Sequence, residues 1–112
     1  MNIIKQNREL TAAEIYKMTK SASIKKVSEN TDATFEIDAY IIYEDEKEDS
    51  ITEILSILTT DGEVYATNSP TFQREFNDLV TIFELTKEPL PPIKIVEGLS
   101  KSGRTFYRCD LA

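Results

Sequence analysis

Alternating apolar and polar positions mark the clearest strand of the chain, from Ala33 to Tyr43. The odd positions of this segment are all apolar, and the even positions are polar as far as Asp38 before ending in Tyr40 and Ile42. A two-residue period of this kind is typical of a strand with one buried face. We therefore expect the odd positions to face the core.

A helical period marks the segment that begins at Ser69. Ser69 is a favoured N-cap residue, and Pro70 suits the first helical position because its missing N–H needs no partner there. The apolar residues that follow fall on one helical stripe: Phe72, Phe76, Leu79, Val80 and Phe83. This stripe predicts a helix whose phenylalanines pack in the core.

Shorter patterns assign the rest of the chain. Thr11 to Glu14 form a capping-box pattern, which predicts a helix from about residue 12 to 19, entered from a mobile tail of residues 1–10. Further strands are expected over residues 21–28, 51–59, 63–67, 93–97 and 104–111. An acidic hairpin loop is expected over residues 44–50, and the prolines of residues 88–92 predict a stiff connector.

The order of these elements indicates a fold. When the N-terminal helix and the short strand at 63–67 are set aside, the order is three strands, a helix and two strands. This is the order of the OB-fold, a five-stranded Greek-key barrel with a helix between its third and fourth strands. A plain α+β sheet with one covering helix has the same elements. We expect a mainly β, OB-like barrel, formed by residues 1–112 as a single domain.

Composition excludes several kinds of catalysis. The chain has no histidine and one cysteine, Cys109, so histidine-based catalytic pairs, histidine metal sites, cysteine zinc sites and an internal disulfide are all absent. The acidic run Glu44–Asp49 lacks the glycine and the ligand spacing of an EF-hand, so we expect no metal there. A carboxylate enzyme would need acids that converge from several strands, and nothing marks such a set. We expect binding without catalysis and without a cofactor.

Charge is distributed unevenly along the chain. The formal net charge is −7, from 13 basic and 20 acidic residues. Residues 1–28 carry +4 and residues 93–112 carry +2, so the middle of the chain carries −13. Such a chain can present a basic face locally while it stays acidic as a whole.

The last strand carries the most informative candidate site. Its alternation puts Arg104, Phe106 and Arg108 on one face, with Thr105, Tyr107, Cys109 and Leu111 on the other. A ring that stacks on a base, flanked by guanidinium groups that meet phosphates, suits single-stranded nucleic acid. The alternatives are that Phe106 packs in the core while the arginines reach the surface, or that the other face packs inward and Phe106 is merely half-exposed.

Other residues extend this candidate site. Lys101 lies on the turn before the last strand, and Tyr40 offers a second stacking ring unless it is packing in the sheet. Lys94, Lys25 and Lys26 complete the expected nucleic-acid-binding set, although the last two are equally compatible with ordinary surface charge.

Two segments also resemble a known group of proteins. Residues 54–69, ILSILTTDGEVYATNS, and residues 98–106, GLSKSGRTF, resemble small phage-encoded single-stranded DNA-binding proteins of Gram-positive hosts. The resemblance covers residues 51–112. It implies an OB-fold, DNA binding without catalysis, and a role in phage DNA replication or recombination. It carries over Lys101, Arg104 and Phe106 as DNA-binding residues.

Two hypotheses of function follow from the sequence. The first is a single-stranded DNA-binding module that works with replication or recombination proteins, with homo-oligomerisation left open. The second is a small acidic interaction protein that inhibits a host factor through the acidic middle of the chain. The N-terminus lacks the layout of a signal peptide and no apolar run is long enough to span a membrane, so we expect a cytoplasmic protein, in the host cell if it is phage-encoded.

Overall fold

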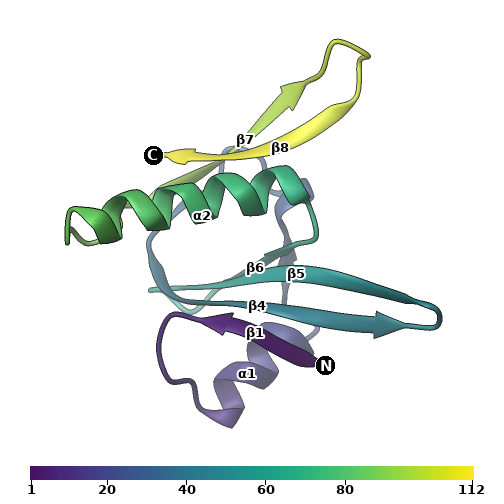
Figure 1. The fold of residues 1–112 in the computed structure, drawn as a ribbon, viewed down its shortest axis with the longest axis vertical. Coiled ribbons are helices and arrows are strands. Elements are labelled where there is room, and N and C mark those ends of the chain that lie inside the picture. The colour runs from purple at the N-terminus through teal and green to yellow at the C-terminus, as the bar shows by residue number, and fades with distance from the viewer.

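Eight strands, two α-helices and one short 3-10 helix make the protein mainly β, in a computed structural model that describes residues 1–112 (Figure 1). In chain order the elements are β1 (Asn2–Gln6), α1 (Ala12–Thr19), β2 (Lys25–Lys26), the 3-10 helix η1 (Val27–Glu29), β3 (Thr34–Phe35), β4 (Ile37–Lys47), β5 (Ser50–Thr59), β6 (Val64–Thr67), α2 (Pro70–Leu85), β7 (Ile93–Leu99) and β8 (Thr105–Leu111). No helix is both long enough and apolar enough to cross a membrane.

The strands form two separate sheets. The first has five strands in the order β1-β4-β5-β6-β2, and the second has three in the order β3-β7-β8. Neighbouring strands are antiparallel except for β2 and β6, which are parallel. β3 and β4 are separated by Glu36 alone, yet they pair in different sheets. The expected OB-like barrel is therefore not confirmed: α2 lies between the β7–β8 hairpin and the first sheet, and the sheets do not close on each other (Figure 1).

Both faces of β4 are buried. On one face, Ile41 belongs to a small apolar cluster with Met18 of α1. On the other face, Tyr40 joins the main core, where its ring meets Phe76 of α2 edge-to-face with centroids 5.0 Å apart. Ala39, Ile41 and Tyr43 share one buried face, as the alternation predicts. The expected single strand over 33–43 is broken at Glu36, however, and Ile37 packs against the main core because the register shifts after it. The even positions Tyr40 and Ile42 are core positions as well, because the apolar stripe of α2 covers that face.

The two helices begin where their capping residues predict. At α1 the backbone N–H of Glu14 donates to Thr11 Oγ1, and the backbone N–H of Thr11 donates to the Glu14 carboxylate. At α2 the Ser69 hydroxyl accepts from the backbone N–H of Phe72, and Pro70 opens the helix. Local hydrogen bonds decide both helix starts, which is why the sequence reveals them.

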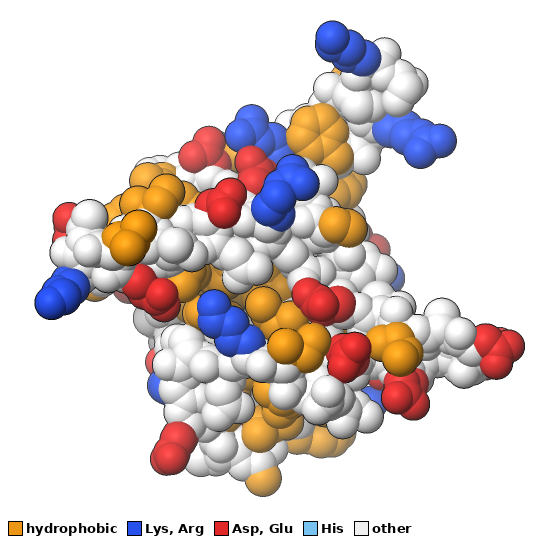
Figure 2. Space-filling view, viewed as in Figure 1, with side chains coloured by type: hydrophobic (Ala, Val, Ile, Leu, Met, Phe, Trp, Pro, Cys, Tyr) orange, Lys and Arg blue, Asp and Glu red, His pale blue; other side chains and the backbone are white.

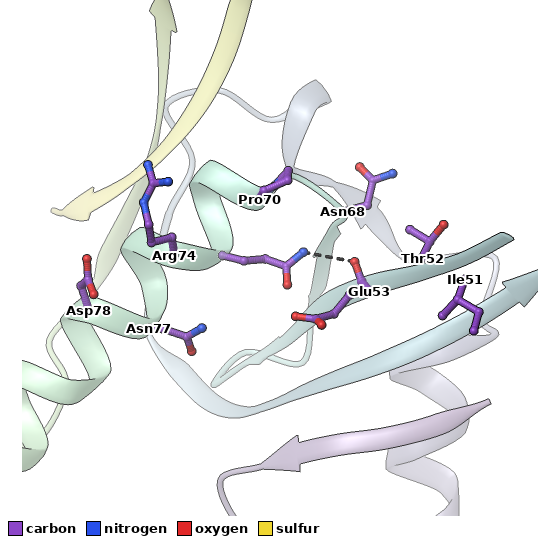
Figure 3. Close-up of a pocket in the computed structure, with 9 residues that line it drawn as sticks. Ile51, Thr52, Glu53, Asn68, Pro70, Arg74, Asn77 and Asp78 are labelled. Atoms are coloured by element: carbon purple, nitrogen blue, oxygen red, sulfur yellow. Dashed lines mark hydrogen bonds between the residues drawn. The ribbon is translucent and has the colours of Figure 1, made fainter.

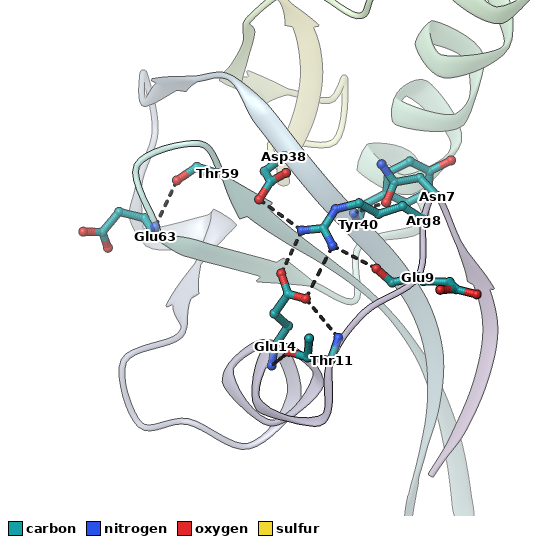
Figure 4. Close-up of polar contacts among 9 residues, drawn as sticks. All are labelled: Asn7, Arg8, Glu9, Thr11, Glu14, Asp38, Tyr40, Thr59 and Glu63. Atoms are coloured by element: carbon teal, nitrogen blue, oxygen red, sulfur yellow. Dashed lines mark hydrogen bonds and ion pairs between the residues drawn. The ribbon is translucent and has the colours of Figure 1, made fainter.

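The first ten residues are not the expected mobile tail. Residues 2–6 form β1, an edge strand antiparallel to β4. A register shift between Ile3 and Lys5 breaks the alternation, which hides the strand from a search for a two-residue period. The loop that follows is also fixed, because Arg8 Nη2 lies 2.8 Å from Glu14 Oε2 and 3.1 Å from Asp38 Oδ2 (Figure 4).

Two other segments differ from expectation. In the segment 21–28 only Lys25–Lys26 are a strand, and Val27 then begins the 3-10 helix. The expected acidic loop at residues 44–50 is mostly strand: β4 and β5 pair up to Lys47 and Ser50, which leaves only Glu48 and Asp49 in the turn. The strand at 63–67 and the last two strands lie where they are expected, within two residues at each end.

Two hairpins project from the core on the same side of the molecule (Figure 1). We call them the β4–β5 arm, residues 44–54, and the β7–β8 arm, residues 97–107. Figure 2 shows acidic side chains at the tip of the β4–β5 arm and basic side chains at the tip of the β7–β8 arm. The surface between the bases of these arms holds the candidate site.

Candidate nucleic-acid interface

The β7–β8 arm presents its two faces as the alternation predicts. Cys109 is buried against the main core and Tyr107 packs at its edge. On the opposite face Phe106 is half-buried, and Arg104 and Arg108 on either side of it are exposed. The turn closes through a hydrogen bond of 2.9 Å from Ser100 N–H to the Arg104 carbonyl. The strand therefore turns Cys109 inward and leaves Phe106 half-buried, which rules out Phe106 as a core residue and fits both a stacking site and plain packing of the opposite face.

Phe106 is held in place by the glycine opposite to it. Gly98 pairs with Phe106 across the hairpin, and a Cβ on Gly98 would lie only 2.6 Å from Phe106 Cζ. The ring thus lies across the glycine backbone, at a position that any larger residue would disturb. A half-buried ring held from one side is a suitable stacking surface for a base.

Three of the expected basic residues have no ion-pair partner: Lys26, Lys101 and Arg104. All of them are exposed. Lys101 and Arg104 lie at the tip of the β7–β8 arm, where no acidic side chain neutralises them. They are free to meet phosphates.

The other three are already paired. Arg108 Nη2 lies 3.1 Å from Glu75 Oε2 of α2, and hydrogen bonding to Glu75 raises the pKa of the Arg108 guanidinium. Lys25 Nζ lies 3.2 Å from Glu63 Oε2, which raises the pKa of Lys25. Lys94 Nζ lies 3.8 Å from Asp32 Oδ1. Each of these ion pairs must break before its basic side chain can bind a phosphate.

Tyr40 cannot stack on a base. Its side chain is 3% exposed, because α2 covers the face of β4 on which it lies. The Lys5 ammonium approaches the same ring at 5.8 Å from its centroid. Tyr40 is a core residue, and its place in the expected binding set is wrong.

A groove of about 750 Å³ joins the bases of the two arms. It is lined by β2 and η1, by Ile54 at the base of the β4–β5 arm and Lys47 beside its turn, by the segment from β6 into α2, and by β8: Lys26, Ser28, Lys47, Ile54, Ala66, Thr67, Asn68, Ser69, Pro70, Thr71, Thr105, Phe106 and Tyr107. It therefore unites Lys26 and Phe106, which lie far apart in the sequence. None of its lining residues is acidic, although the chain has 20 acidic residues. We call it the acid-free groove.

Sequence reasoning missed Lys47. Lys47 sits within the acidic run 44–49, and the surrounding charges hid its role. Antiparallel pairing puts alternate side chains on opposite faces, so Lys47 reaches the groove while its neighbours Glu46 and Glu48 do not line it. A lone cation within an acidic run was the one available signal.

The groove offers ammonium groups, hydroxyls, one side-chain amide and two aromatic residues, which is a set suited to binding. Burial raises the pKa of the Cys109 thiol to about 12, so this thiol stays protonated at neutral pH. No group of three or more Cys, Asp or Glu side chains gathers where it could hold a metal ion. Compared with protein-family models, curated proteins and solved structures, the chain matches none of them.

Proposed function

We propose that the protein binds single-stranded DNA in the acid-free groove and along the β7–β8 arm, without catalysis. The observation that carries the proposal is the groove itself, which combines Lys26, Lys47 and Phe106 and has no acidic lining residue. Basic side chains that follow a backbone, together with an aromatic ring, are the recurring parts of single-strand recognition.

The net charge of −7 does not oppose this binding mode. At about 0.1 M salt the Debye length is about 10 Å, so a phosphate in the groove interacts mainly with nearby charges. The charges that line the groove are the ammonium groups of Lys26 and Lys47, and the carboxylates that flank Lys47 in the run 44–49 act against them. Acidic residues farther away repel weakly, and they limit binding outside the groove.

A single strand fits these residues better than a duplex. Stacking on Phe106 needs a base whose face is free, and the bases of a duplex are already stacked on one another. The OB-like order of elements expected from the sequence favours the same class of ligand, although the structure has six strands before α2 and its two sheets do not close. The resemblance of residues 51–112 favours DNA and a role in phage DNA replication or recombination.

A charge-matched pair of variants tests the proposal. Lys26→Gln with Lys47→Gln removes both groove cations, and Lys20→Gln with Lys87→Gln removes two exposed cations that line no groove and form no ion pair. Fluorescence anisotropy with labelled oligo-dT should show about a tenfold loss of affinity for the groove variant. The matched variant should bind nearly as wild type does.

Two outcomes would contradict the proposal. Equal losses in both double variants would mean that only net charge matters. Wild-type protein that binds duplex as well as oligo-dT would mean that base stacking plays no part. Circular dichroism of each variant establishes that the fold is intact.

A further inference from the structure

Both strand edges of the β4–β5 arm lack a neighbour near its turn, and the longer open edge belongs to β5. β6 pairs with β5 only over residues 55–58 and Thr67 is its last residue. Residues 50–54 of β5 pair with β4 on one side and with no strand on the other. Unpaired N–H and C=O groups along such an edge are a template for another strand.

The ladder shows which backbone groups face this open side. Thr59 N–H bonds to the Glu63 carbonyl on the β6 side of β5, and alternate residues point their backbone groups the same way. Ile51 and Glu53 therefore turn their N–H and C=O groups toward the open edge. Ile51 is also 63% exposed, so its side chain takes no part in the core.

A polar side chain already occupies one position on this edge. Gln73 of α2 is 7% exposed, and its Nε2 donates to the Glu53 carbonyl at 3.2 Å (Figure 3). The amide does what the N–H of a neighbouring strand would do. One turn further along α2, Asn77 Oδ1 is buried and accepts no hydrogen bond. A buried acceptor without a donor is costly, and a ligand N–H would satisfy it.

A second groove, of about 610 Å³, runs between this edge and α2 (Figure 3). Its lining is almost entirely polar: Ile51, Thr52, Glu53, Asn68, Pro70, Gln73, Arg74, Asn77 and Asp78. It shares only Asn68 and Pro70 with the acid-free groove, so the two surfaces can be tested separately.

The charge beside this edge selects its ligand. Glu44 and Glu53 are directly opposite each other on paired strands, where like charges repel. Residues 44–53 contain six acidic residues and one basic residue, Lys47. Two copies of this arm would repel each other, and a nucleic acid would be repelled as well. Glu44 accepts a hydrogen bond of 3.0 Å from Asn2 Nδ2, so Glu53 is the carboxylate that a cationic segment at this edge would neutralise.

We propose that the edge of β5 at residues 51–53 binds an extended, basic segment of a partner protein by strand addition. The partner's backbone would pair with Ile51 and with the N–H of Glu53, whose carbonyl is held by Gln73, and a lysine or arginine opposite Glu53 would lie beside its carboxylate. This goes beyond DNA binding, because it assigns the acidic arm a protein ligand of its own.

A matched pair of variants isolates the backbone contact. Ile51→Pro removes the outward N–H of residue 51, and Ile51→Thr removes the same apolar side chain but keeps that N–H. The probe is a short fluorescein-labelled peptide that alternates lysine with threonine. Anisotropy should show at least about a tenfold weaker affinity for Ile51→Pro, and an affinity within about twofold of wild type for Ile51→Thr. Both variants should bind oligo-dT as wild type does.

Hydrogen exchange on the wild-type protein gives a second test that needs no variant. The peptide should slow exchange of the Ile51 and Glu53 amides and leave the amides of β8 unchanged. Peptide binding without this protection, or equal binding by both Ile51 variants, would overturn strand addition. A stable dimer in sedimentation that protects the same amides without peptide would also overturn it, since the occupant would then be a second copy.

Discussion

Single substitutions at Phe106 and at Gly98, which contacts its ring, test whether Phe106 is the proposed stacking surface. Phe106→Ala removes the ring and should weaken oligo-dT binding by about 1–3 kcal/mol. Gly98→Ala should weaken it too without touching any charge, because the new Cβ would lie 2.6 Å from Phe106 Cζ and displace the ring. Leu99→Ala, at a 72% exposed residue of the same hairpin, is the control and should have little effect. Anisotropy titrations compare the three variants, and equal affinities would remove Phe106 from the site.

The Arg8–Glu14 ion pair should make the stability of the fold depend on pH in the acid range. Hydrogen bonding to Arg8, assisted by the Thr11 backbone N–H, lowers the pKa of Glu14 from 4.5 to about 2. A carboxyl whose pKa is depressed by folding stabilises the protein above its ordinary pKa, and this contribution is lost as the pH falls through the folded value. Arg8→Gln should therefore lower the melting temperature most above pH 4.5, with the difference closing toward pH 2. Thermal unfolding followed by circular dichroism measures it, and a pH-independent difference would contradict the assignment.

At the scale of elements, Glu75 joins α2 to β8. Its carboxylate accepts from the Arg108 guanidinium at 3.1 Å and from the Cys109 backbone N–H at 3.3 Å. Glu75→Gln should destabilise the fold by about 1 kcal/mol, measured by urea unfolding, because a charge-assisted contact is weakened. It should also tighten oligo-dT binding, because Arg108 becomes free for a phosphate. Asp78→Asn removes the same charge from the next turn without freeing an arginine, so an equal gain in that variant would assign the effect to net charge alone.

Elements defined by local signals could be predicted, and elements defined by distant pairing could not. The capping residues Thr11 and Ser69 locate both helices, because the hydrogen bonds that start a helix lie within a few residues. β1 was not predicted, because its register shift breaks the alternation of apolar and polar residues. The division into two sheets was not predicted either. β3 and β4 are separated only by Glu36, and no local sequence signal shows that they pair in different sheets.

The site divides in the same way. The alternation on β8 correctly placed Phe106 between two exposed arginines. The ion pair of Arg108 with Glu75 joins residues that are 33 positions apart in the sequence. Tyr40 is buried by α2, which comes later in the chain. Lys47 joins the groove only because β4 continues through the acidic run. Contacts between distant elements decide which basic residues are free, and a single sequence does not contain them.

At the scale of the whole molecule, opposite charges are sorted onto separate surfaces. The acid-free groove and the tip of the β7–β8 arm offer cations, whereas the open edge of the β4–β5 arm carries carboxylates. The net charge of −7 is the sum of these surfaces and describes neither of them. This separation lets a protein with an acidic sequence bind a polyanion at one place and a basic segment at another.

The salt dependence of oligo-dT binding tests the central claim most directly. Lys26, Lys47, Lys101 and Arg104 are free to contact phosphates, since none of them belongs to an ion pair. Each phosphate contact on a single strand contributes about −0.7 to the slope of log affinity against log salt concentration, so a slope of about −3 is expected. Anisotropy titrations at several salt concentrations give this slope. A flat, weak signal even at low salt would contradict single-stranded DNA binding by this protein.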